Sequence, residues 1–109
     1  MKFNLTELVQ FSPEQIASRS LTKNLAVTTP ITLFAFSAGE SISSEKSDLV
    51  KVILVLEGAL TVQYANQLSE VATHNHLLVI PPLSVHQFSA EKNCRFLQIE
   101  IPTSKPKNY

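Results

Sequence analysis

The chain has 109 residues, of which 44% are hydrophobic and 17% are charged. This length fits one domain, and the composition is that of a globular protein rather than of a disordered segment. Nine basic residues balance nine acidic residues, so the formal net charge is zero. Nucleic acid and anionic membranes both attract basic surfaces, and we therefore expect neither as a partner. Zero net charge also leaves self-association unopposed by charge repulsion.

The cysteine content and the N-terminal residues both indicate a cytoplasmic protein. Cys94 is the only cysteine, which excludes an intramolecular disulfide and a zinc site built from several cysteines. A protein with so few cysteines is typical of a reducing compartment. Residues 1–7 lack the apolar stretch of a signal peptide. No apolar run approaches the roughly 20 residues that a transmembrane helix needs.

The N-terminal part of the chain gives only weak helical signals. Residues 4–10 can form one or two helical turns, which are too short to be stable alone. Residues 12–15, Ser-Pro-Glu-Gln, resemble a helix N-cap followed by proline at the first helical position. Residues 16–23 are ambiguous, and we favour a strand. The sequence therefore predicts at most a short helix before residue 16.

Beyond residue 30, short apolar runs alternate with polar breaks, which is the pattern of an all-β protein. Turn signals recur roughly every 8–12 residues, a spacing typical of a β-sandwich or a β-barrel. Residues 102–109 hold two prolines and two lysines, and we expect them to form a flexible tail. The predicted strands are residues 31–36, 49–56, 60–64, 76–80, 85–90 and 94–101.

The run at residues 49–56 is largely apolar on both faces. Side chains alternate along a strand, so Ile53 and Val55 share one face, which we expect to line the barrel. The opposite face then needs a cover of its own. A second subunit is the cover that we expect, which predicts a homodimer; folding of residues 3–16 over this face is the alternative. The face that needs this cover is formed by Val50, Val52, Leu54 and Leu56.

Two stretches of the chain resemble the two sequence motifs of the cupin family. The first motif begins and ends at a glycine, and Gly39 and Gly58 are the only glycines of the chain. The hairpin at residues 55–62, Val-Leu-Glu-Gly-Ala-Leu-Thr-Val, resembles the end of this motif. The second motif comprises a turn, a strand that ends in proline, and a histidine. In this chain its parts are Asn75, residues 76–80, Pro81-Pro82 and His86.

The resemblance spans about residues 31–101 and implies a cupin double-stranded β-helix, also called a jelly-roll barrel. We expect residues 1–109 to form one such domain, with at most a short N-terminal helix. The segment at residues 33–40 also resembles a group of small bacterial cupins of unassigned function.

The resemblance does not extend to the metal ligands. Cupins usually hold a divalent metal inside the barrel with three histidines and one carboxylate. Alignment of the motifs places Glu45 and Ser47 at two of the histidine positions, and Lys51 at the glutamate position. Only His86 matches a ligand, and a lysine ammonium among the ligands would repel a cation. We therefore expect no metal and no other cofactor. Iron, manganese, nickel or zinc on His86 and Glu45 is the alternative.

The same alignment places Lys51, His86, Glu45, Ser47 and Ile53 around a pocket inside the barrel. A buried ammonium needs a partner, because its desolvation costs several kcal/mol. We therefore expect an ion pair between Lys51 and Glu45. Lys51 could then bind an anionic ligand or act as a desolvated nucleophile. For Lys51 itself we favour a purely structural ion pair or a side chain that reaches the rim. His86 either lines the pocket or fills it as a core residue.

Two further features could be mistaken for sites. His74 and His76 flank Asn75 in the predicted turn, and we expect surface histidines there that bind zinc or nickel only opportunistically. Asn75 can adopt the left-handed conformation that a glycine would supply. We expect Cys94 to be a small buried apolar residue rather than a nucleophile.

The sequence thus predicts a non-enzymatic protein that binds or senses a small molecule through the barrel pocket. A metal-dependent cupin enzyme of dioxygenase or isomerase type, with an atypical ligand set, is the first alternative. A structural or interaction role of the dimer is the second. The altered ligand set favours binding over catalysis, although a fold does not determine a function.

Overall fold

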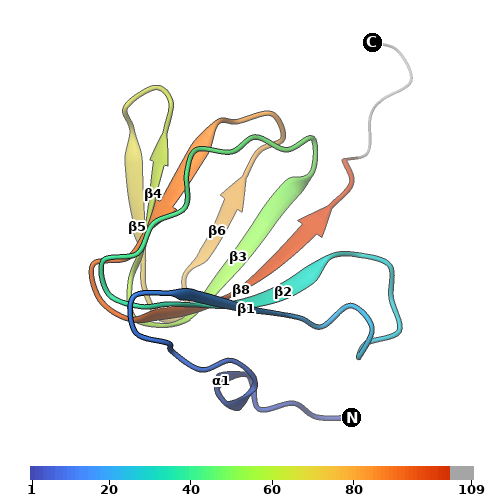
Figure 1. The fold of residues 1–109 in the computed structure, drawn as a ribbon. Helices are drawn as coiled ribbons and strands as arrows, with labels where there is room; N and C mark the ends of the chain where they lie inside the picture. Colours follow the sequence, from blue (N-terminus) through green and yellow to red (C-terminus); the bar gives the residue numbers. More distant parts are fainter. Residues whose placement is uncertain (104–109) are drawn as a thin grey trace, which may run out of the picture.

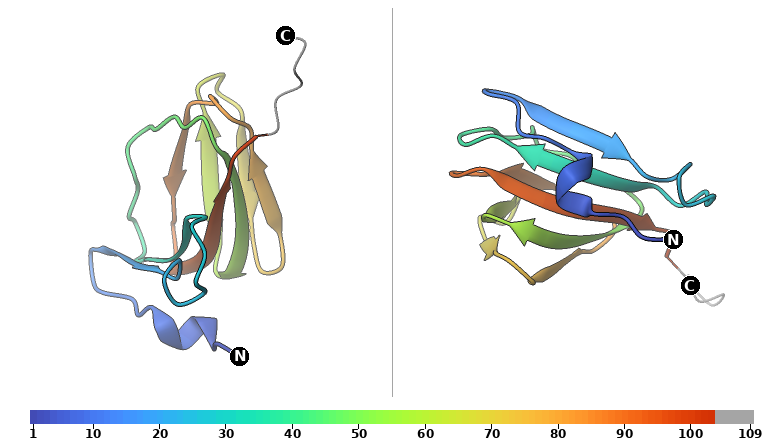
Figure 2. Two further views of the ribbon diagram at one scale, coloured as in Figure 1. Left: turned by 90° about the vertical axis from the view of Figure 1, so that its right-hand side faces the viewer. Right: turned by 90° about the horizontal axis from the view of Figure 1, so that it is seen from below.

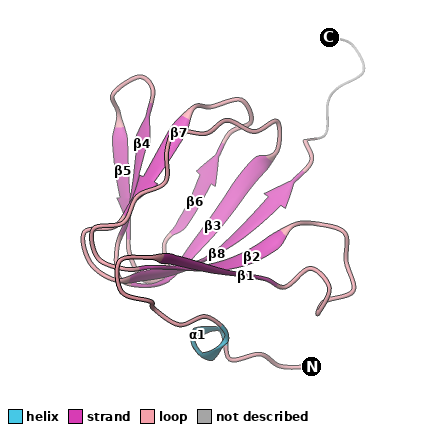
Figure 3. Ribbon diagram, in the orientation of Figure 1, coloured by secondary structure: helices cyan, strands magenta, loops and turns pink. Residues whose placement is uncertain are grey.

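The computed structural model describes residues 1–103 of the chain. This part contains eight β-strands and one four-residue helix, joined by turns and loops. The all-β class, with a short N-terminal helix, is confirmed (Figure 3). The predicted tail lies, from residue 104 onward, outside the described residues. The elements are α1 (Leu5–Leu8), β1 (Ile16–Ser20), β2 (Ile31–Phe36), β3 (Val50–Glu57), β4 (Leu60–Tyr64), β5 (Ser69–Ala72), β6 (Leu77–Ile80), β7 (His86–Ser89) and β8 (Cys94–Ile101).

The strands form two antiparallel sheets that face each other (Figure 1). The larger sheet has the order β1-β2-β8-β3-β6, and the smaller has the order β5-β4-β7. Residues 37–49, here called the crossing segment, lead from β2 to β3. This segment runs beside β7, where Ser41 bridges to Ser89 and Glu45 bridges to His86. The result is a jelly-roll barrel, whose wall includes the crossing segment.

The predicted strands all form, and the structure adds one strand and removes one helix. β5 was missed because Ser69–Ala72 contains no apolar run. β1 lies in the ambiguous stretch, where a strand was favoured. The expectation of a helix start at residues 12–15 is wrong. The Gln15 N–H donates to the Ser12 carbonyl at 3.0 Å, and Glu14 has a φ of 59°, so this segment is a turn that leads directly into β1.

The two motif turns have the backbone conformations that their residues favour. Gly58 has a φ of 78°, and a Cβ atom there would lie 2.1 Å from the Asn93 carbonyl oxygen. Only glycine therefore fits between β3 and β4. Asn75 has a φ of 69°, which confirms that it takes the place of a glycine before β6.

The barrel interior is filled at one end by apolar side chains. Phe34, Phe36, Phe88 and Phe96 form an aromatic group with ring centroids 5.0 to 6.2 Å apart. This packing leaves the polar interior residues toward the other end. The buried residues of this core are Phe36, Ile53, Val55, Leu60, Val62, Ala72, Leu78, Ile80, Phe88, Ala90, Cys94 and Phe96.

A second apolar cluster lies on the outer face of the larger sheet, beneath the N-terminal segment. Figure 2 shows α1 crossing this face below β2 and β8. Leu5, Leu8 and Phe11 pack there against buried Leu33 and Ala35. Among the described residues, no helix is long and apolar enough to cross a membrane.

The N-terminal cover reaches only one end of β3. Leu56 packs against the N-terminal cluster, so the alternative cover is present at that residue. Val52 and Leu54 lie on the same outer face and are only half-buried. Next to them on β6, Leu77 and Val79 are exposed. A cover for this part of the face remains a prediction.

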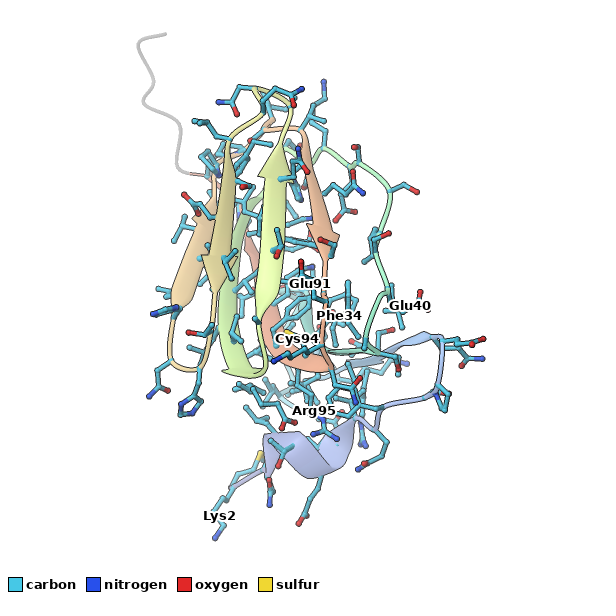
Figure 4. All side chains as sticks on the ribbon, turned by 90° about the vertical axis from the view of Figure 1, so that its left-hand side faces the viewer. Lys2, Phe34, Glu40, Glu91, Cys94 and Arg95 are labelled. Atoms are coloured by element: carbon cyan, nitrogen blue, oxygen red, sulfur yellow. The ribbon has the colours of Figure 1, made fainter. Side chains whose placement is uncertain are left out.

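Arg95, on the outer face of β8, fastens the N-terminal segment to the sheet. Its Nε atom donates to the Val9 carbonyl at 2.9 Å, and its guanidinium lies 4.2 Å from the centre of the Phe11 ring. It also forms an ion pair with Glu57. Figure 4 shows Arg95 between the sheet and α1. One side chain thus joins residues 9–11 to the larger sheet.

We expect Arg95→Met to loosen the N-terminal segment without unfolding the barrel. The methionine keeps the apolar stem but loses the charged hydrogen bonds, so the free energy of unfolding should fall by about 1–3 kcal/mol. Limited chymotrypsin digestion should then cut at Phe11 before the barrel unfolds. Arg19→Met is the matched control, because exposed Arg19 makes only a 3.5 Å bond to Leu8 O. Equal effects of both substitutions would contradict this role of Arg95.

Candidate functional site

Lys51 lies inside the barrel because of the alternation of side chains along β3. Lys51, Ile53 and Val55 are the buried residues of this strand, and their neighbours point outward. The Lys51 side chain is only 4% exposed. Lys51 therefore lies in the barrel interior, and the alternative in which its side chain reaches the rim is wrong.

A single β-bridge brings the other two polar residues of the site together. The Glu45 N–H donates to the His86 carbonyl at 2.9 Å, and the His86 N–H donates to the Glu45 carbonyl at 3.0 Å. His86 is the first residue of β7, and Glu45 belongs to the crossing segment. Backbone pairing thus fixes the positions of both side chains opposite β3.

The Lys51 ammonium donates to both of these residues. Its Nζ atom lies 2.6 Å from Glu45 Oε1 and 2.9 Å from His86 Nε2. The predicted ion pair with Glu45 is confirmed. On another side, the centre of the Phe88 ring lies 5.4 Å from Nζ, a distance at which an aromatic face attracts a cation. The ammonium therefore has charged, polar and aromatic partners.

The hydrogen bonds of His86 determine its tautomer. Nδ1 lies 2.8 Å from the Ser84 carbonyl oxygen, which can only accept, so Nδ1 carries the proton. In the neutral ring, Nε2 is then the acceptor for the Lys51 ammonium. A metal ion would need this same lone pair. Lys51 therefore forms a hydrogen bond to Nε2, the atom through which His86 would coordinate a metal.

The three side chains differ in their access to solvent. Those of Lys51 and His86 are 4% and 1% exposed, whereas that of Glu45 is 40% exposed. Both contacts of the Glu45 carboxylate in the site use Oε1. Three surface pockets of 260 to 330 Å³ lie elsewhere on the described residues. Glu45 is therefore the residue of this site that is most open to solvent.

Two other residues predicted for the pocket have different partners. The Ser47 carbonyl accepts from the Leu83 N–H at 2.6 Å, and its hydroxyl accepts from the Leu49 N–H at 3.1 Å. Ile53 is fully buried in the apolar core. The structure thus brings together Lys51, Glu45 and His86, and it places Ser47 and Ile53 in loop and core contacts. Ligand binding by these five residues stays a prediction.

Sequence reasoning missed the polar end of β8. Gln98 is 6% exposed and donates to Glu100 Oε1 at 3.1 Å. Glu100 is paired with Lys51 in the strand register. The available signal was the alternation along residues 94–101, in which Gln98 and Glu100 continue the inward face of Cys94 and Phe96. A strand that is apolar at one end and polar at the other indicates at which end of the barrel the polar interior residues lie.

His74 and His76 are exposed in the turn around Asn75, as expected. His76 Nδ1 accepts from the Thr73 N–H at 2.9 Å. Within residues 1–103, no three His, Cys, Asp or Glu side chains come close enough together to hold a metal ion. Opportunistic metal binding by the two histidines stays a prediction.

Cys94 is fully buried in the barrel core, which confirms that it is a small buried apolar residue. Burial, followed by the nearby charge of Glu57, raises the pKa of its thiol to about 12. The thiolate is the reactive form of cysteine. A buried thiol with so high a pKa does not act as a nucleophile near neutral pH.

We expect removal of Glu45 to cost more stability than removal of Lys51. Glu45→Ala leaves a buried ammonium without its carboxylate and should lower the free energy of unfolding by about 2–3 kcal/mol. Lys51→Met leaves a carboxylate that water can reach and a buried His86 Nε2 without its donor, and should cost about 1–2 kcal/mol. Urea denaturation measures both, with the exposed residues Glu91→Ala and Lys46→Met as controls. A larger loss for Lys51→Met would contradict this order.

Three solved structures illustrate what the fold resembles. A conserved protein of unknown function from Streptococcus pyogenes has a TM-score of 0.83 at 20% identity, over 96% of this chain and 90% of that chain. A cupin superfamily protein from Desulfitobacterium hafniense DCB-2 has a TM-score of 0.81 at 20% identity, over 94% and 92%. A cupin 2 conserved barrel domain protein from Leptotrichia buccalis has a TM-score of 0.81 at 25% identity, over 91% and 47%.

No protein-family model and no curated protein matches the sequence. These three solved structures share the fold of this chain, and their names state no specific function. The resemblance that the two sequence motifs indicated is confirmed at the level of the fold: this chain is a small cupin-fold protein.

Proposed function

We propose that this cupin-fold protein binds or senses a small molecule at Lys51 and carries out no catalysis. The observation that supports this proposal is the ammonium held between Glu45 Oε1 and His86 Nε2, at 2.6 and 2.9 Å. An ammonium supplies a fixed positive charge that can hold a polar ligand group. It supplies neither an open coordination position nor a redox centre. Binding is the activity that this chemistry supports best.

We also propose that the barrel holds no resident metal, because the residues present do not fit one. Glu45 and His86 are only two possible ligands, fewer than the three protein ligands of a typical catalytic zinc site. The ammonium between them would repel a divalent cation. A metal could bind only after Lys51 moved away or lost its proton.

This proposal predicts that one substitution creates a metal site. Wild-type protein, equilibrated with Zn²⁺ or Mn²⁺ and then desalted, should retain far less than one equivalent by mass spectrometry of the metal. Lys51→Glu provides a third ligand beside Glu45 and His86, and should approach one equivalent. Both proteins should also carry His74→Ala, so that the exposed turn does not contribute.

The result that would contradict the proposal is stoichiometric metal in the wild-type barrel that His86→Ala removes. That result would support the first alternative, a metal-dependent enzyme of dioxygenase or isomerase type with an atypical ligand set. Iron, manganese, nickel and zinc would then all be candidates.

Binding can be tested by nuclear magnetic resonance with ¹⁵N-labelled protein. We expect one class of small molecule to cause saturable chemical shift changes at Glu45, Lys51 and His86. Neutral sugars, primary amines and short carboxylates should be titrated separately, with Lys51→Met as the control. If no class shifts the signals of these residues, the proposed binding function is wrong.

We propose, second, that the protein forms a homodimer through the outer face of the larger sheet. On β6, Leu77 and Val79 are 60% and 53% exposed, and the outward residues of β3 beside them are also apolar. Burial of each such side chain is worth roughly 1.5–3 kcal/mol. A two-fold axis lets two copies cover the same face of each other. An interaction role could use this dimer independently of any ligand.

Val79→Lys should dissociate the proposed dimer, because it places an unpaired charge in the interface. The residue is half exposed in one chain, so the fold itself should tolerate lysine. By light scattering we expect twice the chain mass of 12.1 kDa for wild type and the single mass for the variant. Val71→Lys, at a residue 60% exposed on β5 of the smaller sheet, should remain dimeric. A wild-type monomer at micromolar concentration would contradict the proposal.

We propose a reducing compartment, the cytoplasm, as the place where the protein works. The support is that its only cysteine, Cys94, is a buried free thiol. Disulfides are common in oxidising compartments and rare in the cytosol.

A further inference from the structure

We propose that the ligand of this site is a small monocarboxylate, and that it binds by displacing the Glu45 carboxylate from Lys51. Glu45 is then a built-in competitor that occupies the ligand position in the free protein. This inference rests on the proposed binding function and names its ligand class and its regulation.

The first support is that only Glu45 can leave the site. Lys51 and His86 belong to strands of opposite sheets, and both are buried. His86 is also held by the Ser84 carbonyl. The Glu45 side chain is 40% exposed, and its backbone bonds to His86 do not depend on where the carboxylate points. Rotation of this side chain into solvent would therefore leave the β-bridge intact.

The second support is that departure of Glu45 removes the only carboxylate within ion-pair distance of Lys51 among the described residues. The Lys51 ammonium is buried, and desolvation of an unpaired charge is costly. His86 contributes a neutral acceptor through Nε2 and cannot balance the charge. A conformation with Glu45 turned outward is thus stabilised by any anion that takes over the 2.6 Å contact with Nζ.

The chemistry of the position favours a carboxylate over other ligands. The space that Glu45 vacates has the size of a carboxylate and lies beside a positive charge. An amine would be repelled by Lys51, and a sugar hydroxyl would leave the charge of Lys51 unbalanced. The nearby residues are apolar: the Phe88 ring lies 5.4 Å from Nζ, and Ile42 packs against the core that contains Phe88. A short aliphatic chain beyond the carboxylate is compatible with these residues.

The displacement mechanism has an unusual signature. A tethered competitor acts at an effective concentration in the millimolar range or higher. A free carboxylate should therefore bind wild-type protein weakly. Removal of Glu45 should strengthen binding, although Glu45 is itself part of the site. Loss of an ordinary contact residue would have the opposite effect.

The test uses sodium acetate as the probe, with sodium chloride at equal ionic strength as the reference. Thermal unfolding midpoints are measured for wild type, Glu45→Ala, Glu45→Ala/Lys51→Met and the exposed control Glu91→Ala. We expect acetate to raise the midpoint of Glu45→Ala saturably, with half-saturation at a concentration at least about tenfold below that of wild type. The double variant should show no rise, and Glu91→Ala should behave as wild type. Methylammonium chloride should stabilise none of them.

The inference is overturned if folded Glu45→Ala gains nothing from acetate, or if the double variant gains as much. Should Glu45→Ala fail to fold, Glu45→Ser is the second variant, to which the same order of affinities applies. If sugars or amines shift the Lys51 signals of wild type but carboxylates do not, the ligand class is wrong while the binding function stands. If Glu45→Ala binds acetate but wild type binds no ligand of any class, the binding function falls, and this inference with it.

Discussion

An ammonium group inside a β-barrel must be paired, and the arrangement of the whole site follows from this requirement. Lys51 is directed inward by the alternation of β3, so its charge cannot reach water. The crossing segment brings a carboxylate to it, and β7 brings a neutral imidazole. The Ser84 carbonyl keeps the proton of His86 on Nδ1, which leaves Nε2 as an acceptor. Each partner thus presents an acceptor atom to the ammonium.

The rest of the fold separates this polar group from the apolar core. Four phenylalanines pack one end of the barrel, and the ring of one of them, Phe88, also contacts the Lys51 ammonium. The outer face of the larger sheet makes different contacts. There Arg95 holds the N-terminal segment over β2 and β8, while the outer residues of β6 remain exposed. The proposed ligand binding and the proposed association would therefore use opposite faces of β3.

The sequence predicted those features that depend on local patterns. Strands appear where apolar residues recur in short runs, and the Lys51–Glu45 pair follows from motif spacing and the cost of an unpaired buried charge. β5 was not predicted, because an exposed edge strand such as Ser69–Ala72 needs no apolar run. Residues 12–15 have the composition of a helix start, but their turn leads directly into a strand.

The features that sequence reasoning missed depend on contacts between distant residues. Arg95 meets Val9 and Phe11 across more than 80 residues of chain, and no local pattern reports such a contact. The pairing of Glu100 with Lys51 depends on the register between β8 and β3. The contact between the Phe88 ring and the Lys51 ammonium also depends on how the strands are arranged across the barrel. Spacing along the chain indicates which residues share a face, whereas the partners across the barrel require the folded structure.

A crystal structure of the protein grown in the presence of Mn²⁺ or Zn²⁺, with an anomalous difference map, tests the central claim most directly. We expect Lys51 Nζ within hydrogen-bond distance of Glu45 Oε1 and His86 Nε2, and no anomalous peak beside His86. A metal ion coordinated by His86 Nε2 inside the barrel, with Lys51 turned away, would contradict the replacement of a metal by the lysine ammonium.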